Sequence, residues 1–235
     1  TTNTILSSYL GYVRGTGTIY SNNITSLASA DVNLRDDEIQ INGKDDDSNT
    51  YELHTYTTTD TSLKDRLGYE VEYYYKNDNS SDRTLMFCTL KGKEPVVINA
   101  KNIETSSTDG SQVKYYEKDT DDKTKSLSLA SDNKVIYNGK YTGSSFNVSS
   151  DLPKVGQVKF IDSDNDGRYD VIDITSYDVY YVSTKDTSST SIIDNLVANA
   201  ENKVLKLDVD SDRNLSIVNK DGKTVTYSSI STGNI

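Results

Sequence analysis

The sequence predicts an all-β fold with one or two short helices, organised as two or three small antiparallel β-barrel or sandwich modules. Short runs of β-branched and aromatic residues recur along the chain, and clusters of turn-forming residues separate them. Asn-Gly or Asp-Gly pairs, which favour tight hairpin turns, stand at residues 42–43, 138–139 and 221–222. Helical spacing of apolar residues is rare.

In the N-terminal part, the strongest strand pattern lies at residues 69–75, where residues alternate strictly between two faces. Residues 84–90 would pair with this strand across a polar connection. A short helix is expected at residues 61–67, because Thr61 can cap its start and Gly68 can end it. The strands expected here are 11–21, 38–41, 51–58, 69–75, 84–90 and 96–98.

Farther along, a second short helix is expected at residues 192–200, and residues 142–153 and 183–191 have the composition of loops. The final strands would form a β-meander. The strands expected in this part are 113–117, 126–129, 134–137, 155–161, 171–182, 203–209, 215–219 and 224–228.

A run of Thr, Ser and Asp at residues 103–110 suggests a boundary between modules. We therefore expect an N-terminal β-module at 1–103, a middle β-module at 104–183 and a C-terminal meander at 184–235 that packs with the middle module. Ordinary hairpins within one large β-protein are the alternative, because the sequence shows no regular repeat.

Composition excludes several classes of function. The 235 residues carry a formal net charge of −11, which disfavours binding to a nucleic-acid backbone. No segment has the length and hydrophobicity of a membrane span, so no membrane insertion is expected. The single cysteine, Cys88, stands in an apolar run and is expected to be buried rather than reactive.

Residues 162–173 have the spacing of a calcium loop. Acidic residues occupy loop positions one, three, five, nine and twelve, and Gly167 stands at position six, where a sharp turn is needed. Calcium takes six to eight oxygen ligands, which such a loop can supply. The expected ligands are Asp162, Asp164, Asp166, the backbone carbonyl of Arg168, Asp170 and Asp173.

The segments on either side of this loop are strand-like, whereas an EF-hand needs a helix on each side. Asp173 is also one methylene shorter than the glutamate usual at position twelve. We therefore expect a calcium-binding β-hairpin. The alternative is an acidic hairpin without metal, whose aspartates accept hydrogen bonds from turn amides.

The sequence offers no set of catalytic residues. The only histidine, His54, lies in an expected strand and lacks the sequence context of a catalytic triad. A glycosidase needs only two carboxylates, which this acidic chain cannot exclude. With no tryptophan present, exposed tyrosines would have to bind a sugar. We expect no enzymatic activity.

The segment 156–182, with its Asp-rich turn, resembles a β-module of large bacteriophage virion proteins and of surface-layer-type proteins of Gram-positive bacteria. Residues 67–76 and 135–140 are similar to segments that precede this turn in those proteins. The resemblance implies an all-β, non-enzymatic building block within a longer polypeptide, in a tail or baseplate.

We therefore expect a structural or interaction component of a bacteriophage virion, stabilised by calcium and assembled with other structural subunits, most simply copies of itself. The alternative is a bacterial cell-surface module for adhesion or glycan binding, located outside the cell. A host-surface glycan is then the expected partner.

Overall fold

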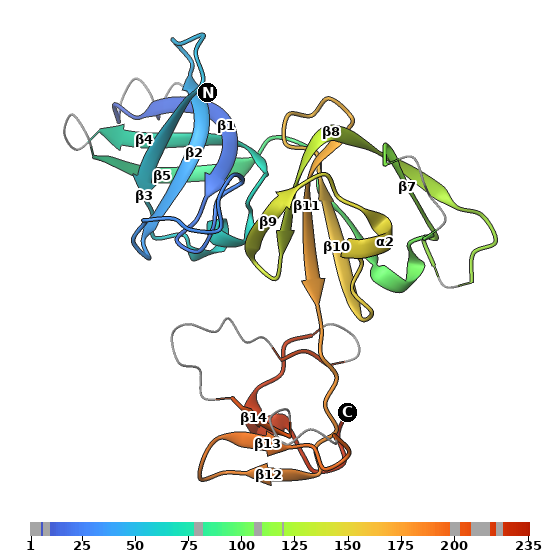
Figure 1. Ribbon diagram of the computed structural model, residues 1–235. Coiled ribbons are helices and arrows are strands. Elements are labelled where there is room, and N and C mark those ends of the chain that lie inside the picture. Colours follow the sequence, from blue (N-terminus) through green and yellow to red (C-terminus); the bar gives the residue numbers. More distant parts are fainter. Residues whose placement is uncertain are drawn as a thin grey trace. The chain divides into compact units, whose positions relative to one another are not determined.

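The computed structural model describes residues 6, 10–77, 82–105, 110–118, 120–197, 203–207, 217–219 and 223–235. These residues form an all-β structure, as predicted, with strands in three sheets (Figure 1). The chain divides into two compact units, Thr1–Tyr177 and Asp178–Ile235. No helix in the described part is long and apolar enough to cross a membrane.

Five strands of the first unit close into a barrel in the order β1-β2-β3-β5-β4. Neighbouring strands are antiparallel except β3 and β5, which meet in parallel at Thr57 and Thr84. Five-stranded Greek-key barrels include the OB fold, but a topology by itself assigns no function. The strands are β1 (Val13–Ser21), β2 (Glu38–Asp45), β3 (Glu52–Thr57), β4 (Glu70–Asn77) and β5 (Arg83–Leu90).

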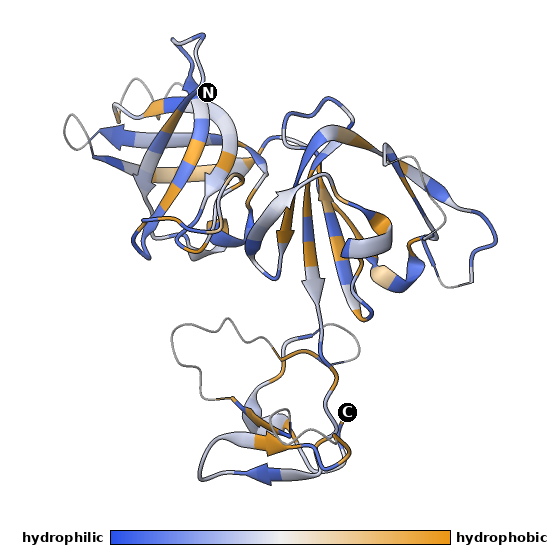
Figure 2. Cartoon of the chain, in the orientation of Figure 1, coloured by the Kyte–Doolittle hydropathy of each residue, from blue (hydrophilic) through white to orange (hydrophobic). Residues whose placement is uncertain are grey.

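Aromatic rings fill the barrel. Tyr56, Tyr73 and Tyr75 are buried, with ring centroids 5.2 to 6.1 Å apart. Glycines make room for them, because a Cβ atom on Gly15 or Gly43 would lie 2.5 Å from the Tyr73 side chain. Apolar and polar bands alternate along the barrel strands in Figure 2, as the period of two requires.

This packing overturns one predicted turn. Residues 42–43 lie inside β2, which continues to Asp45, so the Asn-Gly pair does not form a hairpin there. Gly43 serves instead as the close neighbour of Tyr73. The helix expected at 61–67 is a 3₁₀ helix, η2 (Thr61–Asp65), and its start is capped by the Asp60 carboxylate rather than by Thr61.

The second sheet of this unit has the order β6-β10-β11-β8-β7, and β9 also pairs with β8. The prediction of purely antiparallel pairing is wrong for β8 and β11, which are parallel. Apolar residues such as Phe160 and Ile172 form a core on one face. The strands are β6 (Val96–Asn99), β7 (Gln112–Tyr115), β8 (Lys125–Tyr137), β9 (Lys140–Ser144), β10 (Gly156–Ile161) and β11 (Tyr169–Ser176).

Several boundaries in this sheet differ from prediction. Strand β8 spans both segments expected at 126–129 and 134–137. Residues 142–153 include the end of β9 and a short helix, α2 (Val148–Asp151). Because β6 pairs with β10, the predicted module limit at residue 103 lies within the second sheet's part of the chain. The turn at residues 138–139 is confirmed, with positive φ at both residues.

The barrel and this sheet share a core. Ile136, Ile161 and Val171 of the sheet belong to the same buried cluster as the barrel residues. The Tyr141 amide donates a hydrogen bond of 2.9 Å to the Thr25 hydroxyl, which lies between β1 and β2. The two sheets are therefore packed as one unit rather than as separate modules.

The second unit contains a small antiparallel sheet of β12 (Thr184–Asp186), β13 (Ser191–Ile193) and β14 (Val204–Lys206). The second unit starts at residue 178, before the boundary predicted between the middle and C-terminal modules at 183/184. The described residues of this unit that form its buried cluster are Val182, Ile192, Leu207 and Ile230.

The helix expected at 192–200 is wrong for the described residues 192–197. Ile192 lies in β13, where it pairs with Lys185 on one side and Leu205 on the other and packs into this cluster. Residues 198–200 lie outside the described residues. Strand 203–209 is present as β14, and its last two residues are also outside them. In place of the last strand pair, the described residues show one bridge, Val218–Thr224, and the 3₁₀ helix η5 (Tyr227–Ser229). The turn at 221–222 is outside the described part.

Candidate metal centre

The Asp-rich segment is the connection of a β-hairpin, as its strand-like flanks predicted. β10 ends at Ile161 and β11 begins at Tyr169, and the two strands pair in antiparallel register. The loop turns sharply through two residues with positive φ, Asn165 at 60° and Gly167 at 93°. Glycine adopts this conformation without a steric penalty, which explains its place at loop position six.

Three of the predicted ligands come together in this loop. One carboxylate oxygen each from Asp162, Asp164 and Asp166 lie within 4.8 Å of one another. Two oxygens on opposite sides of a calcium ion are separated by about 4.6 to 5.2 Å, twice the usual Ca–O distance. The three aspartates could therefore hold a metal ion.

The same carboxylates organise the loop backbone. Asp162 accepts hydrogen bonds from the amides of Asp166, at 3.1 Å, and Gly167, at 3.0 Å. Asp166 accepts one from the Arg168 amide at 2.7 Å. A carboxylate oxygen that accepts one amide keeps a lone pair for another partner. The turn-capping role considered in the sequence is therefore present and is compatible with a metal ion.

Asp170 lies beside this cluster and accepts a hydrogen bond from the Ser163 amide at 3.1 Å. Burial, together with the nearby charges of Asp164 and Asp162, raises the pKa of Asp170 to about 6, although the Ser163 hydrogen bonds oppose this. The Asp170 carboxyl group therefore lies in a region of excess negative charge. A cation bound between the aspartates would stabilise its ionised form.

Asp173 is placed differently from its predicted role. It lies within β11, and its carboxylate forms an ion pair of 3.0 Å with Lys159 of β10. The two residues are direct cross-strand partners, so the register of the hairpin, rather than loop spacing, determines its partner. The Arg168 amide donates to Asp166, and its exposed side chain lines a separate hollow.

Residues distant in sequence also reach the loop. The Thr18 hydroxyl of β1 donates to the Ser163 carbonyl at 3.1 Å. The Lys93 ammonium lies 3.7 Å from an oxygen of Asp162, whose side chain is almost fully buried. The loop thus lies where the barrel meets the second sheet. No local sequence signal points to Thr18 or Lys93, because the contact depends on the tertiary fold.

Comparison with known proteins gives no relative. No protein-family model, no curated protein and no solved structure matches this chain.

The other residues considered in the sequence have structural surroundings. His54 lies 3.0 Å from the Glu52 carboxylate at the edge of the barrel. Cys88 packs against the barrel core, and burial raises its pKa to about 12, which leaves almost no reactive thiolate at neutral pH. Tyr73, Tyr74 and Tyr75 are buried and so present no stacking surface for a sugar.

Proposed function

We propose that this chain is a non-enzymatic structural module of a larger assembly, a bacteriophage tail or baseplate, and that calcium bound in the Asp162–Asp166 loop stabilises it. The observation that carries the proposal is the position of the three-aspartate cluster at the junction of the barrel and the second sheet. An ion at this point would stabilise the long-range contacts between the barrel and the second sheet.

The donor set favours calcium among common metals. All three side chains offer hard carboxylate oxygens, which suit calcium and magnesium rather than zinc or copper. Calcium tolerates irregular oxygen cages, whereas magnesium demands near-ideal octahedral geometry and retains several waters. A loop that takes its shape from hydrogen bonds between its own amides and carboxylates fits the more tolerant ion.

The assignment to a virion rests on the resemblance of the 156–182 segment and on the lack of a catalytic set among the residues discussed. A β-rich unit whose two sheets share a core and whose loop binds a metal ion suits a component of an assembly that must stay rigid under mechanical load. The alternative, a cell-surface module, shares the same metal chemistry.

Thermal unfolding with and without calcium tests the metal proposal. A ligand that binds only the folded state stabilises it by about 2.7 kcal/mol at a hundredfold excess over its Kd. For a unit of this size, that corresponds to a midpoint raised by about 5–10 °C relative to protein in EGTA. An unchanged midpoint at saturating calcium would remove the metal from the proposal.

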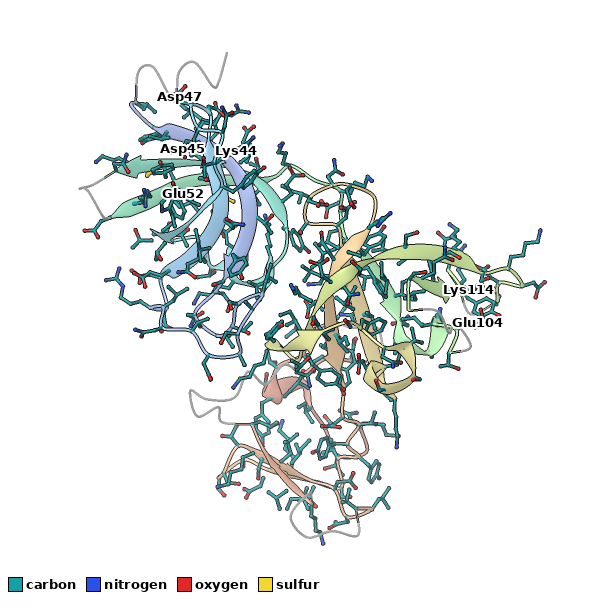
Figure 3. All side chains as sticks on the ribbon, turned by 45° about the horizontal axis from the view of Figure 1, so that its top comes forward. Lys44, Asp45, Asp47, Glu52, Glu104 and Lys114 are labelled. Carbon is teal, nitrogen blue, oxygen red and sulfur yellow. The ribbon has the colours of Figure 1, made fainter. Side chains whose placement is uncertain are left out.

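A matched pair of variants locates the effect. Asp164→Asn should abolish most of the calcium-dependent rise, because it removes one ligand charge from the cluster. Asp47→Asn removes the same charge from the exposed turn between β2 and β3, where Figure 3 labels Asp47, and should leave the rise intact. Equal loss in both variants would indicate a general charge effect rather than a site.

The assembly proposal has a separate test in the neighbouring reading frames. Genes for tail or baseplate proteins beside this one would support it. Surface-anchoring repeats in the same polypeptide would overturn the virion assignment in favour of the cell-surface alternative, whatever the calcium experiment shows.

A further inference from the structure

A hollow of about 660 Å³ lies beside α2 in the first unit, and its described lining does not include the aspartates of the Asp162–Asp166 cluster. Its size falls within the range of small-molecule sites, about 300–1,000 Å³. The described residues that line it come from four parts of the chain: Thr105 with 110–112, residues 129–131 and Asn133 of strand β8, residues 145–149, and Arg168.

A bulge in β8 opens this hollow. Along the parallel β8–β11 pair, β11 advances two residues from Tyr169 to Val171, while β8 advances five from Leu129 to Lys134. Three additional residues of β8 are therefore displaced from the ladder. Bulges of this kind occur beside binding and active sites, where they redirect side chains.

Asn133 fixes the shape of the opening. It is 2% exposed, its amide group donates to the Ala130 carbonyl at 2.8 Å, and its side-chain oxygen accepts from the Phe146 amide at 2.8 Å. One buried side chain thus connects two walls of the hollow. Ser145, on the second wall, has a φ of 73°, an uncommon and costly conformation for a residue other than glycine.

The lining has a distinctive chemistry. Leu129, Phe146 and Val148 supply an apolar floor, and serine and amide side chains supply the walls. In a chain with 36 acidic and 25 basic residues, the described lining residues include Arg168 and no carboxylate. Among the described residues, the Arg168 guanidinium has no ion-pair partner, and its side chain is exposed. It is therefore available to a ligand.

We propose that this hollow binds a carboxylate-bearing saccharide, such as a uronic or sialic acid residue, and that Arg168 pairs with the carboxylate. A guanidinium recognises a carboxylate through two parallel hydrogen bonds. The saccharide's hydroxyl groups would meet the serine and amide walls, and its C–H face would lie on the apolar floor. The lack of a lining carboxylate among the described residues also leaves no acid pair there for glycoside hydrolysis.

The tyrosines considered in the sequence do not form this site. It depends instead on a bulge and on side chains from separate segments, which sequence spacing could not indicate. The inference does not rest on calcium binding, because it uses the Arg168 side chain, whereas the predicted metal ligand at this position is the backbone carbonyl.

Titration calorimetry and saturation-transfer NMR on the full chain test the inference. The probes are the methyl glycosides of N-acetylneuraminic acid and galacturonic acid, with methyl galactoside and the methyl ester of the galacturonide as uncharged counterparts. We expect the acids to bind and the uncharged counterparts to bind at least tenfold more weakly. Equal binding of acid and ester, or no binding of either acid at millimolar concentration, would overturn the inference.

Two variants and a control assign the site. Arg168→Gln should weaken binding of the acids at least tenfold, and Ser131→Trp should do so by filling the hollow. Arg35→Gln removes a guanidinium that pairs with Asp37 and Glu38 in the barrel part, and it should bind as the parent does. Unchanged binding in both Arg168→Gln and Ser131→Trp overturns the site.

The same variant separates this inference from the proposed function. Arg168→Gln keeps the backbone carbonyl, so a calcium-dependent rise in melting temperature should persist when saccharide binding is lost. An acidic peptide that binds in the hollow when both saccharides fail would contradict the saccharide assignment.

Discussion

At the scale of single residues, the Asp-rich loop is held by side chains that lie close together along the chain. Asp162, Asp164, Asp166 and Gly167 act within one turn, so their sequence spacing translates directly into proximity. Asp173 does not, because in a strand the register with Lys159 outweighs counting along the chain.

Gly17 offers a sharp test of barrel packing. A Cβ atom there would lie 2.4 Å from the backbone of Asn42 and Gly43, and backbone cannot move aside as a flexible side chain can. Gly17→Ala should therefore destabilise the first unit by about 2–3 kcal/mol, which denaturant titration measures. In Gly92→Ala, the closest atoms are Cβ and Oε2 of Glu70, both at 3.2 Å, so a shift of a few tenths of an ångström suffices and the cost should stay below about 1 kcal/mol. Equal midpoints for both variants would contradict this account.

The barrel tyrosines predict a loss of stability at alkaline pH. Burial raises the pKa of Tyr75 from 10.0 to about 12 and also raises the pKa of Tyr56. The pKa of each of these tyrosines is higher in the folded than in the unfolded state. The free energy of unfolding is therefore unaffected by them below pH 10 and decreases as the pH rises from 10 towards 12. Near-ultraviolet absorbance of tyrosinate should rise together with unfolding of the barrel. If every tyrosine ionised near pH 10 while the barrel stayed folded, the predicted link between tyrosine ionisation and unfolding would be contradicted.

At the scale of elements, strand existence was predictable, and so was the pairing of strands close in sequence, such as β4 with β5, whereas pairing between distant strands was not. The alternation at residues 69–75 indicated β4, and the Asn138-Gly139 turn joined β8 to β9 as expected. Parallel pairing of β8 with β11 left no local signal, because side-chain alternation is the same in parallel and antiparallel strands. The β8 bulge, which opens the hollow beside Arg168, was equally invisible in the sequence.

Calcium binding should act first on the hairpin that carries the loop. We expect amide hydrogen exchange of β10 and β11 to slow on addition of calcium, because the loop joins their ends and local opening of the hairpin would release the ion. Strands β12 and β13 of the second unit serve as an internal reference and should not change. Uniform slowing in both units would point to a general salt effect.

At the scale of the whole molecule, the chain forms two units, and the buried clusters described in them differ in size. The predicted limit at residue 103 lies after β6, which already belongs to the second sheet and pairs with β10. The observed limit at Tyr177 directly follows the end of β11 at Ser176, a few residues before the predicted limit near 183.

The two units should unfold separately. Among the described residues, the first unit has two extensive buried clusters, whereas the cluster in the second contains four buried residues, so the second should melt at a lower temperature. A fragment of residues 1–177 should fold and keep the calcium-dependent midpoint of the full chain. Calorimetry with a single transition in the full chain, or an unfolded fragment, would contradict this division.

The shared core of the barrel and second sheet has a consequence for biosynthesis. The barrel strands end at Leu90, yet the buried cluster around them also requires Ile161 and Val171. At a synthesis rate of ~5–20 residues per second, several seconds separate these events on the ribosome. During that interval the nascent barrel exposes an apolar surface that its own chain has not yet covered, so this is the stage at which the protein most needs a chaperone.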